Sequence, residues 1–237
     1  MADRRQEILD AALALADEDG LDAVSMRAVA QRVGVTAMAL YPHFSSKDAL
    51  LDGLVGRVLA DLDLPDPAGP WRQRLSGLAH AMRELAHRHP AVVPLLFSRP
   101  AVTPDAVRVV DAIYQALLDA GVPPGQVARL ERMLSTFVLG YAVSEVGGRF
   151  AAGTLGTRER RAQLPGTELP AHQELATWLD APCSWEAEFE ADLDDLIRLI
   201  LDMAAPGERT RAVLGQGTAA ISGEGAAPPA PGDGVPD

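Results

Sequence analysis

Apolar residues recur along most of this chain at spacings of three and four, and this period constrains the fold more than any other feature. Such spacing places apolar side chains on one face of an α-helix, whereas a half-buried strand alternates every second residue. The periodic segments are Ile8–Ala16, Met26–Val33, Leu50–Leu62, Leu75–Leu85, Val107–Leu118, Val127–Tyr141 and Phe189–Met203. The sequence therefore predicts an all-α protein of packed helices.

The composition agrees with a helical protein that buries a core. Hydrophobic residues make up 48% of the chain and charged residues 23%, whereas only 5% are aromatic, which favours helices over sheets. The chain has no apolar run long enough for a membrane span and no signal-peptide core near its start, so we expect no membrane partner. The single cysteine, Cys183, allows no intramolecular disulfide and fits a cytoplasmic location.

Glycine and proline divide the chain into segments. Gly20 ends the first helix, a linker covers residues 65–70, and Gly121 to Gly125 separates two later helices. Residues 150–170 are expected to form a long loop. The sequence predicts a small N-terminal domain over residues 1–48, a helical ligand-binding and dimerisation domain over 49–205, and a disordered, Gly/Pro-rich tail over 206–237.

Residues 25–44 carry the strongest functional signal in the sequence. Ser25 can cap a short helix, and Gly34 can adopt the left-handed conformation that a sharp turn needs. Thr36 can cap a second short helix that Pro42 ends. Two short helices joined by a glycine-bearing turn form a helix-turn-helix, whose second helix fits the DNA major groove.

The pattern of faces supports a helix-turn-helix over an ordinary helical hairpin, which is the alternative. Ala30, Val35 and Leu40 would face inward, and the helix over residues 4–19 supplies the third helix that they need. The exposed face of the second helix carries Thr36, Ala37, Met38, Ala39, Tyr41 and His43. Downstream, Ser45 and Asp48 have the spacing of a capping box and predict the start of the next helix.

This segment resembles the tetracycline-repressor (TetR) family of bacterial regulators. The resemblance is carried by Gly20-Leu21, Ser25 to Arg27, Ala30, Gly34-Val35, Leu40-Tyr41, His43-Phe44, Ser46-Lys47 and Leu50-Leu51. It implies that Tyr41 and Lys47 contact phosphates and that Arg27 lies near the groove. Residues Thr36 to Ala39 and His43 would face bases or backbone. The implied function is a sequence-specific transcriptional repressor whose partner is double-stranded operator DNA.

The net charge of −12 argues, by itself, against a nucleic-acid partner. Residues 1–57 contain six Arg and Lys against nine Asp and Glu, so even this part of the chain has a net charge of −3. However, no acid lies between Arg27 and Lys47, and several acids gather between Asp17 and Asp22. We therefore expect few phosphate contacts and a shallow salt dependence of DNA affinity.

The resemblance continues to about residue 204, where it is closest to the tetracycline-repressor-like C-terminal domain. It is carried by Trp71, His87-Arg88, Arg99-Pro100, Phe137-x-Leu139-Gly140 and Glu145. In drug-responsive relatives a histidine and an asparagine hold a magnesium–tetracycline complex, and the corresponding positions here are Leu95 and Leu78. We therefore expect a small, largely apolar inducer held by few hydrogen bonds, and no cofactor.

Helical periodicity gives the candidate lining of the inducer site. The residues are Leu78, Met82, Leu85, Phe97, Arg99, Tyr114, Leu117, Met133, Phe137 and Tyr141. For each of them the alternative is plain packing in the core of a helical bundle.

The final long helix, Trp185 to Met203, is apolar on more than one face and is expected to need two partners. Its main stripe is Leu193, Leu196, Ile197 and Ile200. The resemblance implies that a symmetric copy covers this stripe, with the helix over residues 124–148, in a four-helix dimer interface. Inducer binding would then pivot the helix over residues 45–63 about a hinge near Pro65 to Pro70.

Two other functions compete with a regulator. His80, Glu84 and His87 lie at i, i+4 and i+7 of one helix and could hold a metal in an enzyme, although a polar helix end is the simpler interpretation. The sequence has no nucleophile elbow, phosphate loop or dinucleotide fingerprint, so no enzymatic activity is expected. The third possibility is a helical ligand-binding protein without DNA binding, against which the intact Tyr41, His43 and Lys47 argue.

Overall fold

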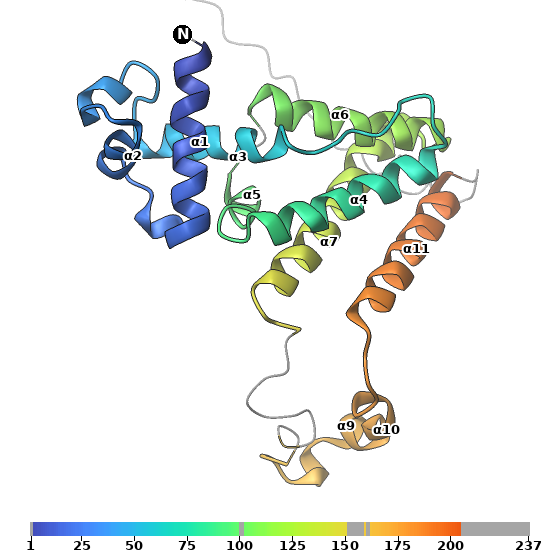
Figure 1. The fold of residues 1–237 in the computed structure, drawn as a ribbon. Helices are drawn as coiled ribbons and strands as arrows, with labels where there is room; N and C mark the ends of the chain where they lie inside the picture. Colours follow the sequence, from blue (N-terminus) through green and yellow to red (C-terminus); the bar gives the residue numbers. More distant parts are fainter. Residues whose placement is uncertain (1, 100–101, 151–158, 160–161, 205–237) are drawn as a thin grey trace, which may run out of the picture.

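The computed structural model describes residues 2–99, 102–150, 159 and 162–204, and these residues form helices and no strand (Figure 1). The predicted all-α fold class is therefore confirmed. The elements in chain order are α1 (Ala2–Asp19), η1 (Leu21–Ala23), α2 (Met26–Val33), η2 (Ala37–Leu40), α3 (Lys47–Leu59), α4 (Trp71–Arg88), α5 (Leu95–Ser98), α6 (Pro104–Asp119), α7 (Pro124–Val146), η3 (Gly166–Glu168), α9 (Pro170–Glu174), α10 (Ala176–Leu179) and α11 (Trp185–Ala204). The tail predicted over 206–237 lies outside the described residues, as do residues 151–158 and 160–161 of the loop predicted over 150–170, whose later part contains η3 and the start of α9.

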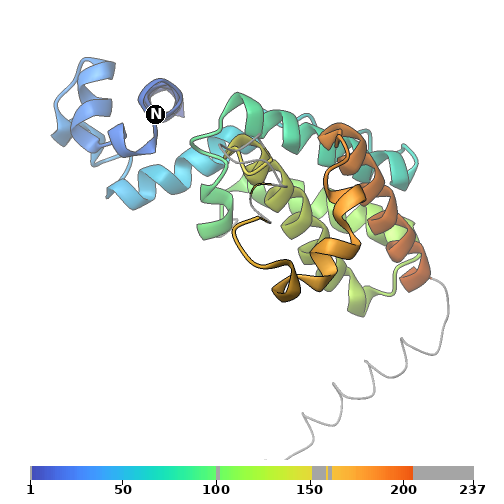
Figure 2. The ribbon, with the colours of Figure 1, turned by 90° about the horizontal axis from the view of Figure 1, so that it is seen from below.

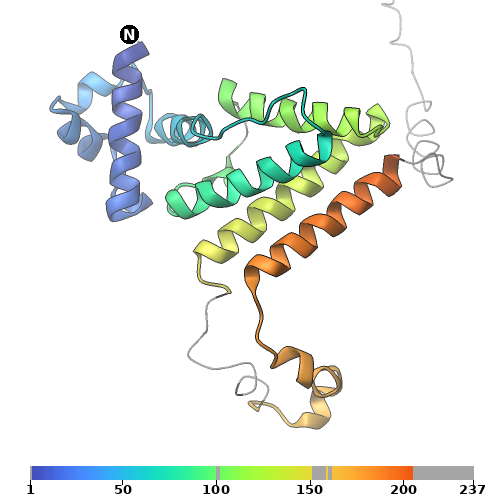
Figure 3. The same cartoon turned by 45° about the vertical axis from the view of Figure 1, so that its right-hand side comes forward.

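The helices form a small N-terminal head and a larger body, and α3 runs from one into the other (Figures 1 and 2). The head consists of α1, α2 and η2, packed on the first part of α3. In the body, α4 packs on α6 and α7, and α11 lies beside α7 and runs in the opposite direction (Figure 3). Helices α9 and α10 lie beyond the ends of α7 and α11 (Figure 1).

The head is held together by the apolar stripe of α1 and by a close approach of α3. Ile8, Ala12 and Ala16 on α1 are all fully buried, as the period of the sequence predicts. A Cβ atom at Gly53 of α3 would lie 2.8 Å from side-chain atoms of both Leu9 and Phe44. The missing side chain at this position therefore lets α3 pack directly against the core of the head.

Arg83 of α4 joins three helices of the body. Its guanidinium donates two hydrogen bonds of 2.7 Å to Glu145 of α7 and one of 2.5 Å to Glu186 of α11. These hydrogen bonds hold the pKa of the Glu145 carboxyl below its usual range. The same guanidinium lies 4.9 Å from the ring centroid of Phe189, so α11 is fixed by both charge and aromatic contact.

The predicted dimer stripe on α11 needs correction. Leu193, Ile197 and Ile200 are buried within the described residues of their own chain, so they are not available to a second copy. The reason is that α11 is apolar on two faces, and the more continuous face packs on α7 and α4. Leu196 is half-buried, and the exposed apolar positions of this helix are Trp185, Leu199 and Leu201.

Candidate DNA-reading surface and ligand pocket

The turn between α2 and η2 has the geometry that the sequence predicts. The Ser25 hydroxyl accepts a hydrogen bond of 3.1 Å from the amide of Ala28, which caps α2. Gly34 ends α2 with φ 77° and ψ 31°, a left-handed conformation that a glycine adopts without strain. The amide of Val35 then bonds the carbonyl of Ala30 at 2.9 Å, which closes the turn.

The second helix is shorter than expected, a single 3-10 turn over Ala37–Leu40. Thr36 precedes it in an extended conformation, but its side chain makes no capping hydrogen bond, contrary to the prediction. Since η2 has only one turn, it presents few amides for a side chain to cap. Within the described residues the Thr36 hydroxyl makes no hydrogen bond, and the side chain is exposed.

The next cap lies one residue later than predicted. Helix α3 begins at Lys47, and the Ser46 hydroxyl, rather than that of Ser45, accepts a hydrogen bond of 3.1 Å from Ala49. Phe44 is fully buried and its amide bonds the carbonyl of Leu40 at 2.9 Å. Because Phe44 is fixed in the core, Ser45 connects it to the cap of α3 at Ser46 and does not cap the helix itself.

We define the reading surface as Arg27, Thr36, Ala37, Met38, Ala39, Tyr41, His43 and Lys47. Six of these eight side chains are exposed, with Met38 at 74%, whereas Ala37 and His43 are half-buried. The carbonyl of His43 accepts a hydrogen bond of 2.6 Å from Arg5 of α1, which anchors this end of the surface. The structure therefore places these residues on the outside of the head.

Ion pairs in the head explain how an acidic segment can still present positive charge. Arg4 pairs with Glu7 at 2.6 Å and Arg57 with Asp10 at 2.6 Å. Arg32 pairs with Glu18, whose pKa lies below its usual range because of that hydrogen bond. Within the described part of the chain, Arg27 and Lys47 have no acidic partner. Arg5 also lacks an acidic partner there, but its guanidinium donates to the His43 carbonyl, so Arg27 and Lys47 are the cations that the reading surface leaves unpaired.

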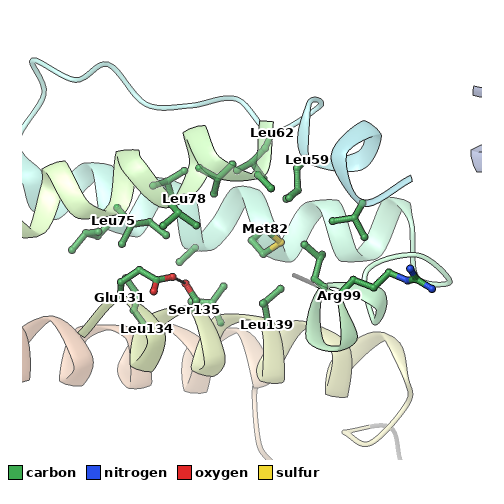
Figure 4. A pocket seen from close by; sticks show the side chains of 18 residues that line it. Leu59, Leu62, Leu75, Leu78, Met82, Arg99, Glu131, Leu134, Ser135 and Leu139 are labelled. Atoms are coloured by element: carbon green, nitrogen blue, oxygen red, sulfur yellow. Dashed lines mark hydrogen bonds between the residues drawn. The ribbon is translucent and has the colours of Figure 1, made fainter. Parts of the chain in front are cut away.

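A cavity of about 220 Å³ lies in the body among α3, α4, α6 and α7 (Figure 4). Its walls are mainly aliphatic, with Leu59 and Leu62 at one side, Leu75, Leu78 and Met82 from α4, Ile113 from α6, and Leu134 and Leu139 from α7. Three lining residues are polar, namely Arg99, Glu131 and Ser135. An apolar cleft with few polar groups is typical of a small-molecule site.

Three of the ten residues predicted to line the inducer site do line this cavity, namely Leu78, Met82 and Arg99. The other seven do not, and the prediction is corrected for Leu85, Phe97, Tyr114, Leu117, Met133, Phe137 and Tyr141. Leu85 and Leu117 are fully buried core residues, whereas Phe97 is 51% exposed.

The error on α7 arises because this helix buries two faces. Phe137 and Tyr141 face α11, where their ring centroids lie 6.3 and 4.9 Å from that of Phe189. A neighbouring face of the helix, with Glu131, Leu134 and Val138, meets the cavity. The aromatic residues of α7 therefore hold the body together instead of lining the ligand site.

The contacts that hold Arg99 were not predicted from the sequence. Its Nη1 donates to Oδ1 of Asp52 at 2.5 Å, and its Nη2 donates to Oδ1 of Asp48 at 2.8 Å. Both acids belong to α3, so a residue at the mouth of the cavity is bound to the helix that begins at the reading surface. The participation of Glu131 in the lining was also missed, because its spacing fits an exposed helix position equally well.

The positions of His80, Glu84 and His87 on α4 do not support the alternative prediction that these residues hold a metal ion. His80 Nε2 lies 2.5 Å from Glu190 of α11 and its Nδ1 lies 2.7 Å from the carbonyl of Ser76. His87 pairs instead with Glu145 at 3.2 Å. Among the residues that the structure describes, no three His, Cys, Asp or Glu side chains are grouped as metal ligands.

None of the helices in the described ranges is both long and apolar enough to cross a membrane.

Two family models match the chain. The model described as "Bacterial regulatory proteins, tetR family" matches residues 8–54, and the model described as "Tetracyclin repressor-like, C-terminal domain" matches residues 64–200.

Individual relatives extend over both parts. An HTH-type transcriptional regulator of Saccharopolyspora erythraea is 30% identical over 197 residues, which cover 81% of this chain and 82% of that protein. Tetracycline repressor protein class A from transposon 1721, of Escherichia coli, is 33% identical over 162 residues, which cover 66% of this chain and 74% of that protein. The crystal structure of the TetR family protein ActR of Streptomyces coelicolor, in complex with actinorhodin, aligns with a TM-score of 0.75 and 26% identity over 85% of this chain and 98% of that one.

Proposed function

The chain belongs to the tetR family of bacterial regulatory proteins, and on that premise we propose that it is a dimeric repressor which leaves its operator when a small, largely apolar ligand binds. We assign residues 1–48 to DNA binding and 49–205 to ligand binding and dimerisation. Such a regulator acts on the chromosome, which places it in the cytoplasm, and no catalytic role is assigned to it.

One observation carries the DNA-binding part of the proposal. Arg27 and Lys47, without acidic partners in the described residues, flank the exposed turn that contains Thr36 to Ala39. Unpaired cations are the groups that neutralise phosphates, and small exposed side chains between them allow close approach to base edges. The amides at the start of α3, beside Lys47, add a partial positive charge at the same place.

Two copies of the head are needed to read two half-sites about 34–36 Å apart. The outer side of α11 suits a contact with a second copy, because Leu196, Leu199 and Met203 follow one another at helical spacing and stay exposed or half-buried. Leu199 is 39% exposed. We propose that this outer stripe, instead of the buried one, meets the partner.

The nature of the cavity supports an apolar ligand. The positions that correspond to the tetracycline-holding histidine and asparagine of drug-responsive relatives are Leu95, buried at the start of α5, and Leu78, in the cavity wall. Neither can ligate a metal or hold a drug by a hydrogen bond. The complex of ActR with actinorhodin supports a small-molecule ligand for this chain as well.

The operator can be identified by selection from random duplex DNA with the full-length protein. We expect an inverted repeat whose half-site centres lie about 10 base pairs, or a multiple, apart. Enrichment of no sequence after repeated rounds, or of a single unrepeated site, would contradict a dimeric operator-binding repressor.

A further inference from the structure

We infer that the cavity takes an apolar ligand with one cationic nitrogen, and that this nitrogen pairs with Glu131. The inference rests on the proposed function, because it names the chemical class of the ligand for the same site. It is carried by the position of a single buried acid in a mainly aliphatic wall.

Glu131 lies on the face of α7 that meets the cavity, and only 8% of its surface is exposed. Its Oε1 accepts a hydrogen bond of 2.8 Å from the hydroxyl of Ser135, one turn further along the helix (Figure 4). Its Oε2 makes no hydrogen bond within the described residues. One oxygen of the carboxyl group is therefore free to take a partner from the cavity.

No cation of the described chain balances this carboxyl group. The one cationic residue in the lining is Arg99, and its guanidinium is bound to Asp48 and Asp52 of α3. Figure 4 shows it pointing away from the cavity, at the opposite end from Glu131. The remaining lining residues, apart from Ser135, are apolar.

A carboxylate in an apolar cavity is unfavourable until a counter-charge or hydrogen-bond donors reach it. A ligand ammonium supplies both, and its apolar part replaces water against the aliphatic wall. A hydroxyl group supplies only a neutral donor, and a ligand carboxylate would be repelled. The site therefore discriminates by charge as well as by shape.

The volume sets the size of the ligand. A cavity of roughly 150 Å³ is enough to hold benzene, so the 220 Å³ found here fits a molecule of one or two rings. A matched series of this size is naphthylmethylamine, naphthalenemethanol and naphthoic acid, which differ in little except the charge of the polar group.

The test is calorimetric titration of the full-length protein with these three compounds. We expect the amine to bind at least about ten-fold more tightly than the alcohol, and the acid to bind most weakly. Glu131→Gln keeps the shape and the hydrogen bond to Ser135, and should bring the amine and the alcohol to within about three-fold of each other. Glu188→Gln, which removes the same charge from an exposed position on α11, should keep the preference of the wild type.

Equal affinity of the amine and the alcohol for the wild type would overturn the inference, and so would a preference for the amine that survives Glu131→Gln. In both cases an apolar ligand still binds, so the proposed function stands. Binding of none of the three compounds would overturn the apolar-ligand site itself, whereas operator selection tests the DNA-binding part independently. Circular dichroism and the melting temperature show whether the Gln variant is folded, and the wild-type comparison of amine with alcohol needs no variant.

Discussion

Arg99 Nη1 donates a hydrogen bond to Oδ1 of Asp52 over 2.5 Å, so a residue at the mouth of the cavity is tied to the helix that begins at the reading surface. A second hydrogen bond, from Nη2 to Asp48, lies closer to Lys47 on the same helix. Ligand binding that moves Arg99 would change how α3 is held, which gives the head and the cavity a direct physical connection.

The first prediction concerns this connection. Asp52→Asn removes one of the two carboxylates that hold Arg99 but leaves the cavity lining unchanged. Because the pair is partly exposed, we expect a loss of about three- to five-fold in operator affinity of the ligand-free protein, together with faster amide hydrogen exchange in α3. Asp63→Asn, an exposed acid beyond the end of α3, should change neither. Unchanged exchange in α3 of the Asp52 variant would contradict the connection.

The second prediction uses two glycines within helices. Alanine is normally more stable than glycine at such a position by about 1 kcal/mol. At Gly56, however, an added Cβ would lie 2.7–2.8 Å from three side-chain atoms of Thr103, which caps α6. We expect Gly56→Ala to lower the free energy of unfolding by about 1–3 kcal/mol.

Gly77 of α4 is the matched control, because an added Cβ would meet nothing within 4 Å. Gly77→Ala should raise the free energy of unfolding by about 0.5–1 kcal/mol in the same urea titration. If both substitutions stabilise the protein, α3 and α6 do not approach each other at Gly56 as described.

The sequence predicted local features well, for a physical reason. The cap at Ser25 and the left-handed Gly34 depend on neighbouring residues alone, and both were predicted correctly. The helical period also identified each long helix in the part of the chain that the structure describes. The cap of α3, however, was predicted at Ser45 and lies at Ser46, because its place depends on the burial of Phe44 in a core made by distant residues.

The third prediction concerns pH. Burial alone would lower the pKa of His80, but the hydrogen bonds to Glu190 and to the Ser76 carbonyl outweigh it, so the pKa lies above its usual 6.5. The protonated histidine therefore stabilises the fold, fully below pH of about 6.5, and this contribution is lost as the pH rises through the higher folded-state pKa.

Urea unfolding of the wild type should show a free energy of unfolding that declines as the pH rises above about 6.5. The Glu190→Gln variant should lack this decline. Glu188→Gln, which removes a neighbouring charge from α11 without a bond to His80, should keep the decline. The same decline in the Glu190 variant would mean that another group causes it.

The fourth prediction concerns assembly. Leu199→Glu places a charge on the outer stripe of α11 and should shift the sedimentation of the protein towards the monomer, because a like charge meets its symmetric copy. Asp194→Asn, which changes an exposed acid on a different side of the same helix, serves as the control and should leave the dimer intact. A dimer of Leu199→Glu as tight as that of the wild type would place the interface elsewhere.

Helical periodicity failed where a helix has more than one buried face. It showed that α7 and α11 are apolar, but could not show which side meets the cavity, a neighbouring helix or a second copy. Phe137 was therefore predicted in the ligand site, although it stacks on Phe189. Likewise, the bonds of Arg99 to α3 join residues about 50 positions apart in the sequence, which no local pattern reveals.

The most direct test of the central claim is a mobility-shift titration on the selected operator with wild type and the double variant Tyr41→Ala, Lys47→Ala. Both side chains are exposed, so the variant should melt at the temperature of the wild type. We predict that the wild type shifts the operator in the presence of excess unrelated DNA, and that the double variant binds at least about ten-fold more weakly. Equal binding by the folded double variant would contradict the assignment of the reading surface, and equal competition by unrelated DNA would contradict a sequence-specific repressor.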